Sequence, residues 1–87
     1  MTALQFQVNE VFDIPTRGGL IAVGSAQNGE FSGIPRPRDA VSGQPIHILG
    51  IDNPTPRTQR TGEIILVVDR ADADYVIVGR LWTAEER

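Results

Sequence analysis

Two arginine-bearing segments are the strongest candidates for binding chemistry in this sequence. Each contains the pattern Pro-x-Pro-Arg, at residues 35–38 and 54–57, and Arg60 follows the second pattern closely. Proline fixes φ and favours an extended path for the preceding residue, so these segments are stiff and lose less entropy on binding. Arginine suits carboxylate or phosphate partners. We predict that both segments lie at the same end or side of the domain and form one basic surface; ordinary connections between strands are an equally good explanation. The arginines of this predicted surface are Arg36, Arg38, Arg57 and Arg60.

Histidine and aspartate residues carry weaker signals. His47 is the only histidine, and because the chain has no cysteine, a metal site around it has no obvious further ligands. We expect a structural or solvent-facing role for it. Asp69, Asp72 and Asp74 are closely spaced, but the glycine and the distal glutamate of a calcium-binding loop are missing. We therefore predict a solvated turn there.

No arrangement of residues indicates an enzyme. Ser25, Ser32 and Ser42 lack the G-x-S-x-G context of a nucleophilic serine, and the carboxylates Glu10 and Asp13 are explained as exposed strand positions. There is no G-x-x-x-x-G-K-[ST] loop and no lysine to serve one, so we expect no tight GTP binding or hydrolysis. The sequence predicts no catalytic residue, no metal site and no cofactor.

The elements that must position these residues are mostly strands. From Leu4 to Ile14 apolar side chains alternate with polar ones, and Glu10 and Val11 interrupt the pattern, which predicts a strand with a bulge or a bend. Gly18 and Gly19 permit a reversal into a strand at residues 20–26. Asn28-Gly29 favours a type I′ turn and hence a hairpin over about residues 20–31.

The rest of the chain predicts further short strands. We expect a long loop at 32–45 holding a short segment at 39–41, a strand at 46–51, a polar loop at 55–61, a buried strand at 64–68, a turn at 69–74, a strand at 75–82 and a polar tail at 83–87. No helical periodicity extends over three turns. The predicted fold class is all-β: a small closed antiparallel β-barrel of five to seven strands with at most one helical turn.

Composition sets limits on function. At 87 residues the chain is expected to form a single domain, residues 1–87. It has 8 Lys plus Arg, all arginine, against 11 Asp plus Glu, and this net charge of -3 argues against broad binding to nucleic acid. The absence of cysteine, of a signal-like N-terminus and of a long apolar run leads us to expect a cytoplasmic protein without a membrane partner.

The order of several short motifs resembles the second domain, a β-barrel, of translational GTPases of the elongation factor Tu family. The matching segments are residues 6–14, the arginine-glycine turn and strand at 17–24, Gly29, the segment 39–41 and Gly50-Ile51-Asp52. The resemblance covers residues 6–81 and implies a stand-alone barrel without the GTPase domain. In that family the glutamate of Gly-Ile-Glu and the basic residues after it help to hold the aminoacylated 3′ end of tRNA. Here Asp52 stands at the glutamate position, and Arg38 replaces the glycine before Asp39.

These observations lead to two functional hypotheses. The first is a protein interaction module, and the second is a module that binds an RNA or tRNA 3′ end, for which the arginine segments must lie beside Asp52. Trp82 and the apolar run 64–68 are further interface candidates, because tryptophan is common at interfaces, although core packing is the default for the run and Trp82 could equally cap the open end of the barrel. A protein partner is the leading expectation, and the oligomeric state is not predicted.

Overall fold

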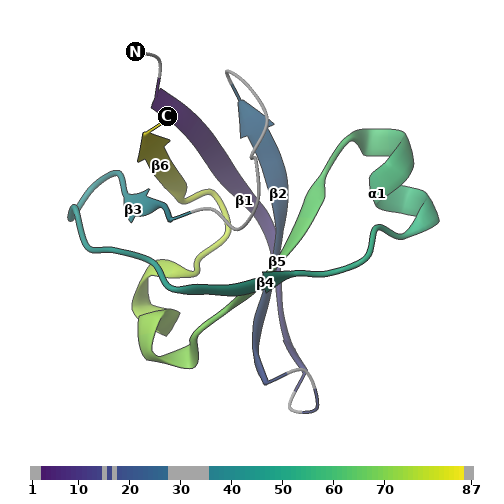
Figure 1. Ribbon diagram of the computed structural model, residues 1–87, viewed down its shortest axis with the longest axis horizontal. Coiled ribbons are helices and arrows are strands. Elements are labelled where there is room, and N and C mark those ends of the chain that lie inside the picture. The colour runs from purple at the N-terminus through teal and green to yellow at the C-terminus, as the bar shows by residue number, and fades with distance from the viewer. Residues whose placement is uncertain (1–2, 15, 17, 28–35, 86–87) are drawn as a thin grey trace.

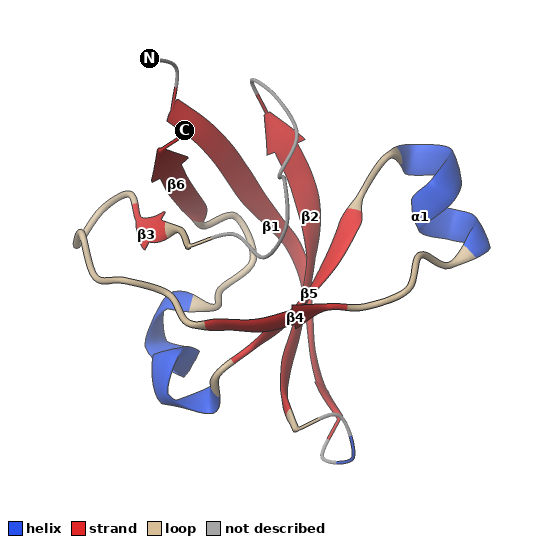
Figure 2. Cartoon of the chain, viewed as in Figure 1, coloured by secondary structure: helices blue, strands red, loops and turns tan. Residues whose placement is uncertain are grey.

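The structure is a computed structural model that describes residues 3–14, 16, 18–27 and 36–85. One curled antiparallel sheet makes up most of it (Figure 1). Its six strands follow the order β3-β6-β1-β2-β5-β4. The strands are β1 (Ala3–Ile14), β2 (Gly19–Gln27), β3 (Arg38–Asp39), β4 (Ile48–Ile51), β5 (Ile64–Val68) and β6 (Leu81–Glu85). Short helical segments lie among these strands (Figure 2). The prediction of an all-β domain is therefore confirmed.

The sheet is a half-barrel rather than the predicted closed barrel. Its outer strands, β3 and β4, each pair on one side only, with β6 and with β5. The chain between them forms an isolated bridge, Arg38 to Pro45, and a hydrogen bond from Ile46 N–H to Pro37 O of 2.9 Å. Because β3 has only two residues, contact on its second side is limited to this bridge and the hydrogen bonds beside it, and no further strand joins the two edges.

Strands β1 and β2 agree closely with the sequence pattern. They pair antiparallel from Gln5↔Gln27 to Ile14↔Gly19, and the register shifts between Val8 and Glu10, just before the interruption predicted at Glu10 and Val11. The predicted turn at Asn28-Gly29 lies outside the described residues.

The main core lies on one face of the sheet. Its buried residues are Phe6, Val8, Leu20, Ala22, Ile46, Leu66, Val68, Val76 and Trp82. The ring of Trp82 stacks on Phe6 with 5.4 Å between centroids, and its Nε1–H donates to the carbonyl of Tyr75 over 3.1 Å. Trp82 is fully buried, so it is not the interface residue that the sequence suggested. Because the indole N–H already has a backbone acceptor inside the fold, the ring does not need to reach water with one edge.

A second apolar cluster lies on the opposite face. Ile21, Val23 and Ile65 are buried there, with Val67 packed against them. Strand β5 thus supplies side chains to both faces, which confirms the prediction from its continuous apolar run.

Two helical segments replace predicted loops. Helix α1 (Pro56–Thr61) occupies the segment predicted as a polar loop, and the 3-10 helix η2 (Arg70–Tyr75) occupies the predicted turn. The prediction of at most one helical turn was wrong. Pro56 suits a loop, but the first position of a helix also tolerates proline well, because the N–H at that position has no intrahelical partner.

The last strand begins later than predicted. Tyr75 ends η2, Gly79 has a φ of 90°, and β6 starts only at Leu81. The turn is held by hydrogen bonds from Gly79 N–H to Val8 O and from Val8 N–H to Arg80 O, of 2.7 and 2.9 Å. Residues 83–85, predicted as a polar tail, therefore belong to the strand.

Candidate binding site

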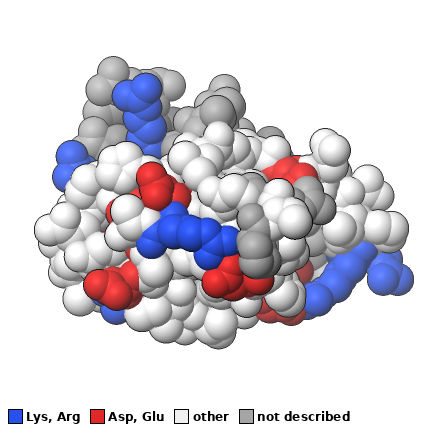
Figure 3. Space-filling model, turned by 90° about the horizontal axis from the view of Figure 1, so that it is seen from below, with Lys and Arg blue, Asp and Glu red and all other residues white. Residues whose placement is uncertain are grey.

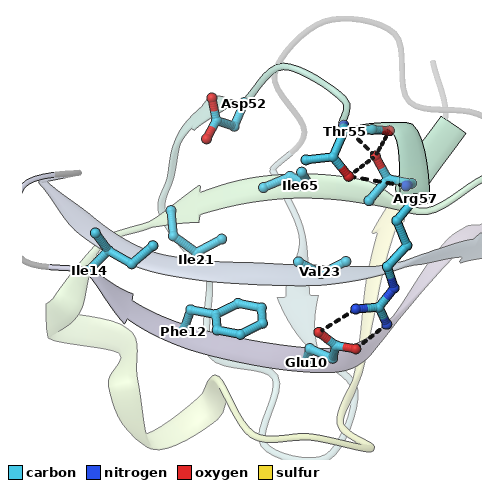
Figure 4. A pocket seen from close by; sticks show the side chains of 10 residues that line it. Glu10, Phe12, Ile14, Ile21, Val23, Asp52, Thr55, Arg57 and Ile65 are labelled. Carbon is cyan, nitrogen blue, oxygen red and sulfur yellow. Dashed lines mark hydrogen bonds and ion pairs between the residues drawn. The ribbon is translucent and has the colours of Figure 1, made fainter.

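A pocket of about 270 Å³ opens on the second face of the sheet, beside α1. We call it the α1 groove. Its lining residues are Glu10, Phe12, Ile14, Ile21, Val23, Asp52, Thr55, Arg57, Thr58 and Ile65. In Figure 4 the apolar side chains lie along neighbouring strands, with the α1 residues at one end. The groove therefore has an apolar floor and a polar end.

The bulge in β1 creates the floor of this groove. Before the bulge, Phe6 and Val8 face the main core; after it, Val11 packs against that core instead. The shift turns the next even-numbered residues to the other face, where Phe12 pairs with Ile21 of β2. A side-chain period of two makes a one-residue shift exchange the two faces. Without the bulge, Phe12 would point to the same face as Phe6.

Helix α1 forms the wall of the groove, and its ends explain why it folds there. Thr55 is the N-cap: its Oγ1 accepts the N–H of Thr58 over 3.2 Å, and Thr58 Oγ1 accepts the N–H of Thr55 over 2.8 Å. Pro56 is suited to the first helical turn, and Gly62, with a φ of 77°, ends the helix in the left-handed conformation. The caps hold Thr55 and the buried Thr58 against the groove.

An ion pair joins the wall to the sheet. Both guanidinium Nη atoms of Arg57 donate to the carboxylate of Glu10, with 3.3 Å between Nη1 and Oε2. These hydrogen bonds raise the pKa of Arg57 above its ordinary value. Figure 4 shows the Arg57 side chain reaching from α1 to Glu10 on β1. The pair marks the polar end of the groove.

Next to this pair lies a second carboxylate that helps to fix the bulge. Glu63 accepts hydrogen bonds from Asn9 Nδ2 over 2.9 Å and from Thr61 Oγ1 over 2.8 Å, and these bonds lower the pKa of Glu63. The same Asn9 amide donates to Ser25 Oγ over 3.1 Å. Glu63 also interacts electrostatically with Arg57. The carboxylates of Glu10 and Glu63 therefore both interact with the guanidinium of Arg57.

Large apolar side chains remain exposed around the opening. Phe12 is 46% exposed and Ile14 39% exposed, although both line the groove. Apolar surface left in water beside a pocket is typical of a binding site.

The four arginines do not form the single surface that the sequence predicted. Arg36 is exposed just before β3, and Arg38 in β3 donates to Gly43 O over 3.3 Å. Figure 1 shows β3 and α1 at opposite ends of the long axis of the molecule, so Arg57 and Arg60 lie far from that pair. On the face in Figure 3, basic side chains lie in separate places instead of one patch. The strand order explains this, because β3 and β4 are opposite edges of the sheet.

Asp52 and Arg57 are the two candidate site residues that the structure brings together, since both line the α1 groove. Asp52 directly follows β4, and its N–H donates to Ile65 O over 2.9 Å. Arg60, on the same helix as Arg57, is exposed and does not line the groove. Sequence reasoning missed Phe12, Ile14 and Glu10 as groove residues; the interrupted alternation at the bulge was the available signal.

The aspartates after β5 are more ordered than predicted. Asp72 is buried, and one of its oxygens accepts the backbone N–H of His47 over 2.7 Å and lies 3.0 Å from His47 Nδ1. Asp69 caps η2 by accepting the N–H of Ala71 over 3.0 Å. The expectation of a solvated turn was therefore wrong for Asp72.

Neither a metal cluster nor a membrane-spanning helix is found in the described part of the chain. No three His, Asp or Glu side chains there are grouped closely enough to hold a metal ion, and no helix there is long and apolar enough to cross a membrane. A scan against protein-family models and searches of curated proteins and of solved structures gave no match to this chain.

Proposed function

We propose that this protein is a non-enzymatic binding module and that its α1 groove receives an apolar side chain from a protein partner. The observation that carries the proposal is the open apolar pocket on the second face of the sheet, with Phe12 and Ile14 half exposed at its side. Covering such an apolar surface lowers the free energy, because it removes apolar atoms from water. A partner that covers Phe12 and Ile14 is therefore stabilised on this face.

The size and chemistry of the groove support a protein partner. Its volume of about 270 Å³ is slightly below that of the pockets that hold whole small ligands, which measure about 300–1,000 Å³. Of the ten described residues that line it, five are apolar: Phe12, Ile14, Ile21, Val23 and Ile65. Anchoring of one large apolar side chain in a pocket is a common basis of protein–protein affinity.

A second candidate function is the binding of an RNA or tRNA 3′ end. Asp52 and Arg57, which the resemblance to the elongation factor Tu barrel relates to that role, line the same groove. Titration of adenosine 5′-monophosphate into the protein tests this alternative, which requires saturable binding at the groove.

Affinity capture from a lysate of the native organism tests the leading proposal. We expect the wild-type protein to retain a protein partner with and without nuclease treatment. The double variant Phe12→Ser/Ile14→Ser should lose that partner and keep its fold, because both side chains are already about half exposed and neither belongs to the buried core clusters. The matched control Ile77→Ser/Val78→Ser changes two exposed apolar residues away from the groove and should retain it. Equal capture by all three proteins contradicts the proposal.

A further inference from the structure

The charges around the α1 groove specify the kind of partner, if the groove is the binding site proposed above. Three charged residues in the described part of the chain line it: Glu10, Asp52 and Arg57. Among the described lining residues the carboxylates outnumber the cation, and Glu63, which interacts with Arg57, adds a further carboxylate beside the ion pair. The whole chain also carries a net charge of -3. A cation is therefore attracted to this groove, and an anion is repelled.

The two members of the Glu10–Arg57 pair differ in how firmly they are held. The Glu10 side chain is 30% exposed and extends from the middle of a twelve-residue strand. The Arg57 side chain is 59% exposed and extends from a helix of six residues. Arg57 is thus the member that can move into solvent, whereas the Glu10 carboxylate stays at the end of the apolar floor.

We propose that Arg57 occupies the place of a partner's cation, and that the groove recognises a protein segment carrying a large apolar side chain next to an arginine or lysine. The apolar side chain packs on Phe12, Val23 and Ile65, and the basic group replaces Arg57 at the Glu10 carboxylate. Displacement of Arg57 costs little, because ion pairs between exposed side chains contribute little to stability. Arg57 then acts as a competitor within the chain, so its removal strengthens binding.

A titration with capped dipeptides tests this inference. The probes are N-acetyl-leucyl-arginine amide, N-acetyl-leucyl-glutamate amide and N-acetyl-leucyl-glutamine amide, followed through the backbone amide signals of Val23 and Ile65 in the 15N-labelled protein. We expect the arginine peptide to shift these signals with the lowest dissociation constant. Glu10→Gln should raise that constant about two- to fivefold, and Arg57→Gln should lower it by a similar factor.

Matched variants separate the local effect from the general effect of charge. Asp13→Asn changes another carboxylate of β1, and Arg60→Gln changes another arginine of α1; neither residue lines the groove. Both should leave the dissociation constant of the arginine peptide within about twofold of the wild-type value, because charges in solvent are screened.

The outcomes distinguish this inference from the proposed function. Tighter binding of the glutamate peptide, or weaker binding of the arginine peptide to Arg57→Gln, overturns the preference for a cation while the groove still binds. Equal binding of all three peptides also overturns the preference. If no peptide shifts the signals of Val23 and Ile65, both the inference and the proposed groove are wrong.

Discussion

The carboxylate of Asp39 is fully buried against the guanidinium of Arg80, which donates from Nε over 2.6 Å and from Nη2 over 2.8 Å. Ser42 donates to the same carboxylate from its N–H and its hydroxyl, both over 2.8 Å. The hydrogen bonds from Arg80 hold the pKa of Asp39 well below its ordinary value. This pair fastens the two-residue strand β3 to the segment that enters β6.

Acid should weaken the protein through Asp39. Because its pKa is lowered in the folded state, the unfolded state takes up the proton first as the pH falls. The stabilisation is complete above the ordinary pKa of about 3.9 and is lost as the pH falls below it. We expect Asp39→Asn to lose about 3 kcal/mol of unfolding free energy at pH 7, since it leaves a charged partner uncompensated.

Urea unfolding of the wild type and Asp39→Asn between pH 7 and pH 3 measures this effect. The difference in unfolding free energy between the wild type and Asp39→Asn should become smaller below about pH 4. The exposed Asp74→Asn is the control and should follow the wild type throughout. A constant difference down to pH 3 contradicts the assignment of this pKa shift to the Asp39–Arg80 pair.

Gly24 is required by close packing between β1 and β2. A Cβ at this position would lie 2.0 Å from Gln7 O and 2.6 Å from Cζ of Phe6. Gly24→Ala should therefore destabilise the fold by about 3 kcal/mol. Gly50→Ala is the matched control, because a Cβ there meets no atom within 4 Å, and it should change stability by no more than about 0.5 kcal/mol. Equal melting temperatures for the two variants would show that the register of β1 and β2 is wrong.

Asp72 and His47 should respond very differently to substitution. Asp72→Ala leaves the backbone N–H of His47 without its acceptor, which costs about 1–3 kcal/mol. His47→Ala keeps that backbone hydrogen bond and removes only a largely exposed ring, so the expected loss is below about 0.5 kcal/mol. Chemical unfolding of both variants checks the order, and a larger loss for His47→Ala contradicts it.

The N-cap of α1 should contribute both to the stability of the fold and to partner binding in the groove. Thr55→Ala removes the hydroxyl that accepts the N–H of Thr58, at a cost of about 1 kcal/mol. Because Thr55 and Thr58 line the groove, the same variant should also weaken binding of the partner. Gln59→Ala, on the exposed side of the helix, should preserve both properties. Loss of stability without loss of binding would show that α1 is not part of the site.

The sequence predicted the sheet better than it predicted the site. Alternation and the continuous apolar run located β1, β2 and β5, because burial on one or both faces selects those patterns. Helix α1 was missed although Thr55, Pro56 and Gly62 occupy its cap positions, since each residue also suits a loop. The Asp39–Arg80 pair joins residues 41 apart in the chain, and no local pattern reveals such a contact.

The groove itself could be predicted only with the exact position of the bulge. A shift of one residue decides whether Phe12 and Ile14 join the main core or the opposite face. The sequence indicated an interruption at Glu10 and Val11. It did not indicate which face of the sheet the side chains after this interruption occupy. The distance between the two arginine segments depends on the strand order, which is a property of the whole sheet.

Photo-crosslinking from a single introduced cysteine tests the central claim, that the α1 groove contacts a protein partner, most directly. The chain contains no cysteine, so Ile14→Cys and Val78→Cys each provide a unique thiol for a benzophenone maleimide, beside the groove and away from it. After irradiation in a lysate of the native organism, we expect a discrete, nuclease-resistant protein adduct from position 14 and none from position 78. No adduct at position 14, or equal adducts at both positions, would contradict the claim.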